Sequence, residues 1–346
     1  MSLITPAMRM GGVLLVASGL LGVLGLCVGS TGWAGVLDTV NAWLLFSQTP
    51  ERLGPVPAQI VWDIRLPRSL GAWLAGALLG LSGAVAQGLF RNPLADPYLL
   101  GSASGAALGV ALALLASGAS GMALSGMARL GMTGAAFVGA VLAVLLTMML
   151  ARGVGQTLRL LLAGVVVGVV LGAATSAITF AHPHLLPTMQ SFGLGTTAFV
   201  GWSACALMAG ALLVSLALAC VFARVLDGLS LGEQAAQSLG FDVRALRLLL
   251  VLVLALATGT AVAQTGLIAF VGLAAPHAVR ALVQVTHRAL LVLSALMGAV
   301  GLLAADVLAR GLFAPLELPL GVLTALLGGG YLLVLMHTQH PQAGRV

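Results

Sequence analysis

Residues 226–247 read LDGLSLGEQAAQSLGFDVRALR, and a long apolar run lies on each side of them, Ala198–Phe222 before and Ala245–Gln264 after. A helix of about 20 apolar residues crosses the hydrocarbon core of a bilayer at about 1.5 Å per residue. Charged side chains are costly inside lipid, so the polar stretch cannot follow the two runs into it. We therefore predict two membrane-spanning helices joined by a polar loop.

The loop has the sequence features of a short helix. Ser230 followed three residues later by Glu233 is a capping-box pattern, which predicts that a helix begins at this point. Gly240 fits the position just after the last helical residue, because glycine adopts a left-handed conformation without strain. Asp242 is placed to cap the next helix, which starts at Val243.

The same loop offers a small apolar face. Ala235, Ala236 and Leu239 would lie on one side of the short helix, where they suit the groove of a partner protein. The alternative is an ordinary solvated loop with one helical turn. The residues alone favour that alternative.

Composition places the whole chain in a membrane. Hydrophobic residues make up 60% of the 346 residues and charged residues only 7%, which leaves too little polar surface for a soluble globule. The apolar runs are continuous, whereas strands of a lipid-embedded barrel alternate apolar and polar residues. The 46 glycines suit helices that approach closely in lipid. The predicted fold class is an all-α polytopic membrane protein.

We predict one transmembrane domain over residues 1–346, with about ten spanning helices. The first apolar run is too long for the central region of a signal peptide and is predicted to be a retained anchor. Residues 182–197 are broken by proline and glycine and are too polar to cross. The ten predicted spans are Gly11–Ser30, Pro67–Leu89, Leu99–Ser117, Leu130–Ala151, Arg159–Phe180, Ala198–Phe222, Ala245–Gln264, Leu267–Val283, Leu290–Arg310 and Pro319–His337.

The basic residues indicate orientation and exclude some functions. All fifteen are arginine. Placing both termini in the cytoplasm puts ten of them inside and five outside, as positive charge in short loops favours. Without lysine the chain has neither a phosphate-binding loop of the GxxxxGK[ST] type nor a Schiff-base nucleophile. No basic patch interleaved with aromatic residues predicts nucleic-acid binding. The three cysteines lack CxxC spacing and predict no metal site.

Six sequence blocks occur in a fixed order. They are RLPRSLGAWLAGALLGLSGAVAQGLFRNPLADPYLLG (65–101), LRLLLAG (158–164), LSLGEQAAQSLG (229–240), TGLIAFVGLAAPHAVR (265–280), HRALLVLSALMGAVGLLAADVLAR (287–310) and LELPLGVLTALLGGG (316–330). Together they closely resemble the FecCD family, the permease subunits of ABC importers for cobalamin, ferric siderophores and haem. The resemblance covers residues from about 64 to 336.

This resemblance implies a non-catalytic subunit with a ten-helix, cobalamin-permease-like (type II ABC importer) fold and no cofactor. It implies a homodimer in the bacterial inner membrane, in contact with lipid, around a central pathway. Two cytoplasmic ATP-binding subunits would power it, and a periplasmic substrate-binding protein would feed it. The absence of a nucleotide-binding motif agrees with a borrowed energy source.

The resemblance also implies roles for particular residues. The segment at about 230–242 matches the coupling helices that sit in a cleft of each ATPase, with Ser230, Leu231, Gly232, Glu233, Gln234, Ala235, Gln237, Leu239 and Gly240 as contacts. Arg65, Arg68 and Arg310 would pair with carboxylates on the lobes of the binding protein, although arginines at helix ends also snorkel to the interface. Gln156, Thr157 and Leu158 match the cytoplasmic gate, where only Thr157 has the usual small polar character.

The cargo prediction rests on residues at the expected outer end of the pathway. His182 and His184 flank a proline at the expected outer mouth of the pathway, and neutral histidine is a usual axial ligand of haem iron. Gln190 and Gly195 stand where relatives carry an aromatic-rich string, and would widen and polarise the wall. Haem is therefore the first prediction, followed by ferric siderophore and cobalamin. The alternative is a solvated loop whose histidines have no role.

Two intramembrane polar residues bear on a different class of function. An ion-coupled secondary transporter needs ionisable groups near the bilayer midplane. Asp306 is the one carboxylate well inside an apolar span, and Arg310, one helical turn later, predicts an ion pair for it. His277 is expected to be packed or hydrogen-bonded. The secondary transporter remains the runner-up, and no HExxH pair supports an intramembrane protease.

Overall fold

The computed structural model describes residues 5–29, 59–117, 126–151, 157–238 and 242–338. Its elements are helices: α1 Pro6–Cys27, η2 Ile60–Arg65, α4 Leu66–Phe90, η3 Pro97–Leu100, α5 Ser102–Ser117, α6 Gly126–Leu150, α7 Thr157–Ala181, η4 Pro183–Leu185, α8 Leu186–Leu194, α9 Trp202–Val221, α10 Ala223–Ser230, α11 Glu233–Ser238, α12 Val243–Thr265, α13 Val271–Leu282, α14 His287–Gly311 and α15 Leu320–Thr338. The predicted all-α class is confirmed.

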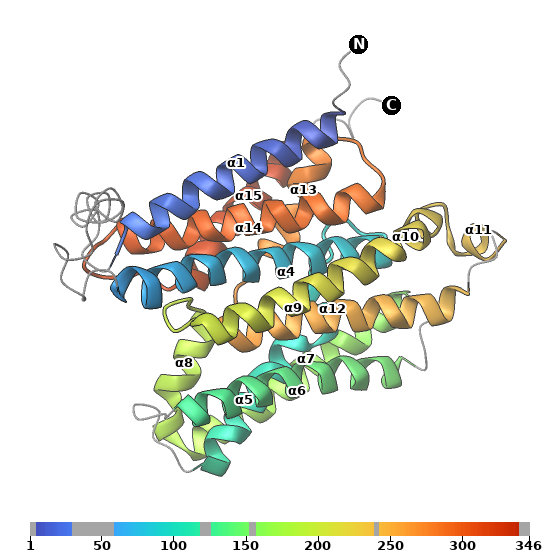
Figure 1. Cartoon of the computed structure of the whole chain (residues 1–346). Helices are drawn as coiled ribbons and strands as arrows, with labels where there is room; N and C mark the ends of the chain where they lie inside the picture. The colour runs from blue at the N-terminus through green and yellow to red at the C-terminus, as the bar shows by residue number, and fades with distance from the viewer. Residues whose placement is uncertain (1–4, 30–58, 118–125, 152–156, 239–241, 339–346) are drawn as a thin grey trace.

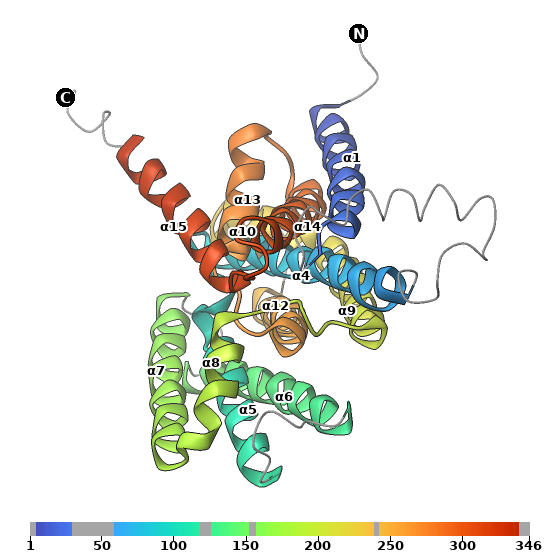
Figure 2. The same cartoon turned by 90° about the vertical axis from the view of Figure 1, so that its left-hand side faces the viewer.

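The long helices lie roughly side by side and give the molecule two distinct ends (Figure 1). α10 and α11 lie at one end, together with the start of α1 and the ends of α13 and α15. The opposite end holds α8, the start of α4 and the end of α14. Viewed along the bundle, α5, α6 and α7 form a group beside α12, and α1 lies on the far side next to α14 (Figure 2). The first and the last described helix thus begin and end, respectively, on the side of α10 and α11.

Helices occupy all ten predicted spans, but they are not equally long. In the described ranges, seven helices are long and apolar enough to cross a membrane. Ser102–Ser117 and Leu320–Val334 are apolar but shorter. The eighth predicted span, Leu267–Val283, contains a helix of only 12 residues. Hydropathy therefore located the apolar segments, while the ten full-length spans were not confirmed.

α4 is the central element of the fold. Its side chains from Gly71 to Phe90 are buried, apart from Trp73, because α14, α12, α13 and α9 surround it. Glycines allow the closest approaches: a Cβ at Gly76 would collide with the carbonyl of Gly298, and a Cβ at Gly80 would collide with the carbonyl of Ser294. Helices in lipid have no hydrophobic driving force for association, because lipid tails are as apolar as the side chains. Close van der Waals packing at small residues therefore holds them together. α4 and α14 consequently form one closely packed pair.

α13 begins part-way through its predicted span because the chain before it is extended. Gly266 has φ +71° and Phe270 has φ +69°, so helix cannot continue through this segment. Hydrogen bonds join this part of the chain to the end of α8 and the residues after it. Leu267 N–H donates to the carbonyl of Phe192 in α8 at 2.9 Å, and Thr196 N–H donates to the carbonyl of Thr265, the last residue of α12, at 2.7 Å. These bonds satisfy backbone groups that lipid could not satisfy.

The turn between α4 and α5 is fixed by Asp96. Its carboxylate accepts from Tyr98 N–H at 2.7 Å and so caps η3. Burial of this carboxyl raises its pKa from 3.8 to about 6, although the hydrogen bond from Tyr98 acts in the opposite direction. The folded protein therefore binds this proton more tightly than the unfolded chain does. Stability falls as pH rises from about 4 to 6, and the penalty is complete above pH 6.

We expect Asp96→Asn to stabilise the protein at pH 8 by about 1–3 kcal/mol, because the amide oxygen keeps the cap while the buried charge is removed. The difference from wild type should vanish near pH 4. Thermal unfolding in detergent at both pH values measures it. A stabilisation of equal size at both pH values would contradict the titration argument.

Candidate functional site

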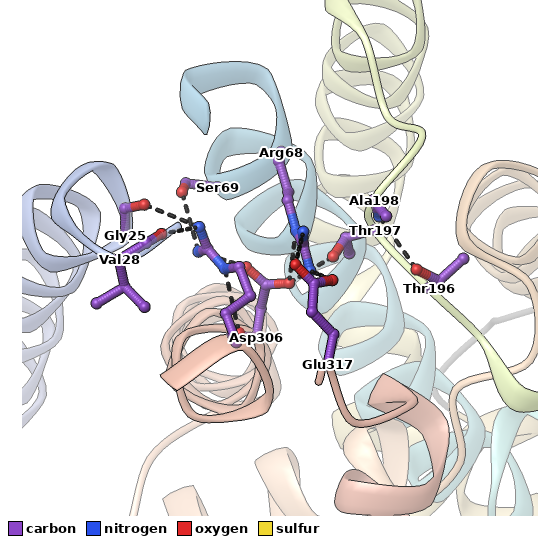
Figure 3. Close-up of polar contacts among 10 residues, drawn as sticks. Gly25, Val28, Arg68, Ser69, Thr196, Thr197, Ala198, Asp306 and Glu317 are labelled. Atoms are coloured by element: carbon purple, nitrogen blue, oxygen red, sulfur yellow. Dashed lines mark hydrogen bonds and ion pairs between the residues drawn. The ribbon is translucent and has the colours of Figure 1, made fainter. Parts of the chain in front are cut away.

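The outer polar cluster, defined as Arg68, Asp306, Arg310 and Glu317, joins the start of α4 to the end of α14 (Figure 3). The start of α4 and the end of α14 lie at the end of the molecule opposite α10 and α11 (Figure 1). Asp306 and Arg310 are one turn apart on α14, and Arg310 Nη2 lies 2.6 Å from Asp306 Oδ2. The ion pair predicted for Asp306 is confirmed. Because each side chain is only 1% exposed, each ion depends on the other for its charge compensation.

Arg310 is further held by α1 and α4. Its Nη1 donates to the carbonyls of Gly25 at 2.9 Å and Val28 at 2.8 Å, and its Nη2 donates to Ser69 Oγ at 3.4 Å. A Cβ at Gly25 would collide with Ser69 Oγ, so this glycine lets α1 approach the guanidinium. In this structure the Arg310 guanidinium is buried and bonded within the chain, and its pairing with a binding protein stays a prediction.

Arg68 joins three elements at the outer surface. Its Nε lies 3.4 Å from Asp306 Oδ1, while its two terminal nitrogens contact Glu317, Nη1 to Oε1 at 3.1 Å and Nη2 to Oε2 at 2.9 Å. The hydroxyl of Thr197, on the segment between α8 and α9, also donates to Asp306 Oδ1. One carboxylate thus ties the starts of α4 and α9 to α14 (Figure 3).

Arg65 lies one turn before Arg68 and is half-buried. Its Nη1 donates to the carbonyl of Leu26 at 2.9 Å, which attaches η2 to the end of α1. Of the three arginines predicted to dock, Arg65 and Arg68 remain near the surface. Arg68 nevertheless already has a carboxylate partner on its own chain.

A hollow of about 370 Å³ opens between the discontinuous helices. It is mainly apolar, and α15 supplies a third of its lining. The residues around it are Tyr98, Ala103, Gly193, Leu194, Leu267, Ala269, Gly321, Val322 and Ala325. The end of α8 and the irregular segment before α13 place backbone beside this hollow, as expected where irregular chain lines a cavity within a membrane protein.

The residues proposed from the sequence for cargo contact lie near α8. The rings of His182 and His184 are 5.8 Å apart and nearly perpendicular, just after α7 ends. Gln190 is exposed on α8. Gly195 differs from its prediction: a Cβ there would collide with the carbonyl of Leu267, so this glycine permits close packing instead of widening the wall.

The helix pair formed by α10 and α11 differs in detail from the predicted single helix. Ser230 ends α10, and its hydroxyl donates to the carbonyl of Asp227 at 2.6 Å. Glu233 begins α11 and pairs with buried Arg247 of α12 at 3.4 Å. The capping box is therefore wrong, because Gly232, at φ +113°, breaks the helix between its two members.

The exposed surface of the helix pair is more polar than predicted. Leu231, Gln234 and Gln237 are exposed, whereas Ala236 packs inside the chain's own core. Ala235 is half-buried, and Leu239 and Gly240 lie outside the described residues. The predicted cap of α12 is confirmed: Asp242 accepts from the N–H groups of the second and third following residues at 3.1 Å each.

Asp227 was missed by the sequence analysis. Its Oδ1 accepts from His287 N–H at 3.1 Å and lies 2.7 Å from His287 Nδ1. His287 is the first residue of α14, so a carboxylate from α10 caps α14 from outside. The two residues are 60 positions apart in the sequence, so no local pattern predicts this contact.

The predicted gate residues are only partly described. Gln156 lies outside the described residues, Thr157 begins α7, and Leu158 is 70% exposed. His277 lies against Tyr331 of α15, with ring centroids 5.7 Å apart, as expected of a packed histidine. The gate assignment stays a prediction.

A helical subunit with a hollow between broken helices and an exposed helix pair at one end has the form of a membrane permease. The family model of the FecCD transport family matches residues 8–338, and the chain belongs to that family. It is thus a multi-pass inner-membrane permease of an ABC importer.

Named relatives agree with this family. The chain is 41% identical over 285 residues to the hemin transport system permease protein HmuU of Yersinia pestis, covering 82% of this chain and 84% of that one. It is 44% identical over 270 residues to the vitamin B12 import system permease protein BtuC of Salmonella typhi, covering 78% and 80%.

A solved structure described as an inward-facing conformation of a metal-chelate type ABC transporter has a TM-score of 0.80 with this chain. The two are 28% identical, and the match covers 95% of this chain and 99% of the other. PsaBC from Streptococcus pneumoniae shares the fold more distantly, with a TM-score of 0.56.

Proposed function

We propose that this chain forms the homodimeric permease of a haem importer, with both termini in the cytoplasm. Two ATP-binding subunits contact α10 and α11, and a periplasmic binding protein docks at the opposite end, near Arg65 and Arg68. The observation that carries the cargo assignment is the pair of histidine rings 5.8 Å apart beside α8, the helix that reaches the hollow.

The exposed apolar surface of α7 supports the homodimer. Val169 is 67% and Leu162 is 58% exposed in the single chain. α7 stands at the edge of the bundle, next to α8, and the outward-pointing α15 lies on the same side (Figure 2). A second copy on this side would enclose the hollow between two subunits, as a central pathway requires.

The cytoplasmic position of α10 and α11 is supported by charge. The arginines near this end include Arg224, Arg244 and Arg288, and positive charge in short loops is retained on the cytoplasmic side. The exposed residues Leu231, Gln234 and Gln237 then face the compartment that holds ATP. An amphipathic helix with one apolar anchor and polar neighbours suits a groove of a partner protein.

Haem suits the histidine pair because neutral imidazole is a usual axial ligand of its iron. The relative from Yersinia pestis that carries hemin in its name supports the same cargo. Cobalamin is the second candidate, since the vitamin B12 permease relative is 44% identical. Its cobalt can also accept an imidazole nitrogen, so only transport measurements separate the two.

We test the cargo with proteoliposomes that contain the permease, the ATP-binding subunit and the binding protein. Wild type should import haem, and the double variant His182→Ala, His184→Ala should import it at least several-fold more slowly. His337→Ala, which removes an exposed histidine near the cytoplasmic end of α15, is the matched control and should import at the wild-type rate.

Two results would contradict the proposed transport of haem through contact with these histidines. Unchanged haem import in the double variant would exclude histidine contact with cargo. If wild-type proteoliposomes import cobalamin but no haem, the second candidate replaces the first.

A further inference from the structure

We infer that Glu317 is an intramolecular competitor at the docking surface. It occupies the outer edge of Arg68 while no binding protein is present, and a carboxylate from the docking lobe takes its place. The inference rests on the proposed docking at Arg65 and Arg68. It adds that exchange of one carboxylate for another on Arg68 regulates the affinity of that docking.

The geometry of Arg68 divides its guanidinium into an inner and an outer part (Figure 3). Nε lies towards buried Asp306 at 3.4 Å, while Nη1 and Nη2 lie 3.1 and 2.9 Å from the two oxygens of Glu317. This paired arrangement is the one in which arginine recognises a carboxylate most strongly. Any carboxylate that replaces Glu317 finds the same donors in the same positions.

The two acids on Arg68 differ in how easily they can be replaced. The Asp306 side chain is 1% exposed and also pairs with Arg310. The Glu317 side chain is 29% exposed, and its described contacts are those with Arg68. Ion pairs near solvent contribute little to stability, because water competes for both ions. Glu317 can therefore leave while Asp306 keeps the guanidinium in position.

The position of Glu317 links the docking surface to the hollow. It stands on the connection between α14 and α15, beside Leu312, Phe313 and Leu316, which are 54%, 61% and 76% exposed. Apolar side chains around an exchangeable ion pair make a suitable contact surface for a protein lobe. The connection leads directly into α15, which contributes Gly321, Val322 and Ala325 to the hollow. Docking would thus release the chain segment next to the pathway.

The test measures the affinity of nanodisc-embedded permease, in complex with its ATP-binding subunit, for the binding protein that supports uptake in proteoliposomes. Glu317→Gln should tighten binding about two- to five-fold, since the incoming carboxylate no longer competes with an ion. Asp63→Asn is the matched control: it removes one negative charge from an exposed position on η2 and should change affinity less. This control separates exchange from a general change in surface charge.

A double-mutant cycle separates the exchange from the docking itself. Arg68→Gln alone should weaken binding, and Glu317→Gln should have no further effect in that background. If Arg68→Gln leaves affinity unchanged, the proposed docking site is wrong. If Arg68→Gln weakens binding but Glu317→Gln does not tighten it beyond Asp63→Asn, docking stands and the exchange is wrong.

Discussion

Asp306→Ala is expected to destabilise the detergent-solubilised permease by about 3–5 kcal/mol, which is the effect of leaving a buried ion without its partner. Arg310 is 1% exposed and would keep its charge with only neutral acceptors around it. Thr197 would also lose the acceptor for its hydroxyl. The change should appear as a fall of several degrees in the thermal unfolding temperature.

Two further variants identify the cause of this loss. Asp306→Ala with Arg310→Met should be more stable than Asp306→Ala alone, because the uncompensated buried charge is gone. Glu317→Gln, which breaks the pair nearest the surface, should cost at most about 1 kcal/mol. If the double variant is no more stable than Asp306→Ala, packing and not charge explains the defect.

Local patterns were sufficient where the interacting groups are close in sequence. The four-residue spacing of Asp306 and Arg310 places both on one helix face, and their ion pair was predicted. The cap of α12 by Asp242 was predicted for the same reason. Runs of apolar residues located every long helix, because lipid requires them to be continuous.

The same local patterns failed where distant residues compete. Ser230 and Glu233 have capping-box spacing, yet Glu233 pairs with Arg247. Arg247 is buried, and leaving its charge without a counter-ion would cost more than leaving the backbone N–H of Ser230 without this carboxylate. Glu317 and Arg68 are 249 residues apart in the sequence, so no local sequence pattern predicts their contact. The burial of Arg310 depends on α1 and could be seen only once the helices were assembled.

Hydropathy also could not distinguish a full span from a broken one. Leu267–Val283 is mostly apolar, but Gly266 and Phe270 have positive φ and delay the helix to Val271. Phe270 pays a strain of about 1–2 kcal/mol that no propensity scale would predict at an aromatic residue. A Cβ at Gly328 of α15 would collide with its side chain, so tertiary packing holds this conformation in place.

Asp227→Ala should lower the number of cargo molecules transported per ATP hydrolysed by about five-fold. Asp227 is the contact through which α10 caps α14, at 3.1 Å to the N–H and 2.7 Å to Nδ1 of His287. α14 packs along α4 and ends in the outer polar cluster, so this contact gives a movement of α10 a direct route along α14 to that cluster. Loss of a helix cap of about 1 kcal/mol corresponds to a factor of about five.

The ratio of transport to hydrolysis makes this effect specific, because a folding defect lowers both rates together. Asp227→Asn should retain most coupling, since its amide oxygen can still accept from the backbone N–H and from Nδ1–H of His287. Arg288→Gln changes an exposed neighbour in the same turn of α14 and serves as the matched control. Uptake and ATP hydrolysis are measured in parallel in proteoliposomes of each variant. If Asp227→Ala keeps the wild-type ratio of uptake to hydrolysis, the contact between α10 and α14 supports the fold but does not transmit the movement.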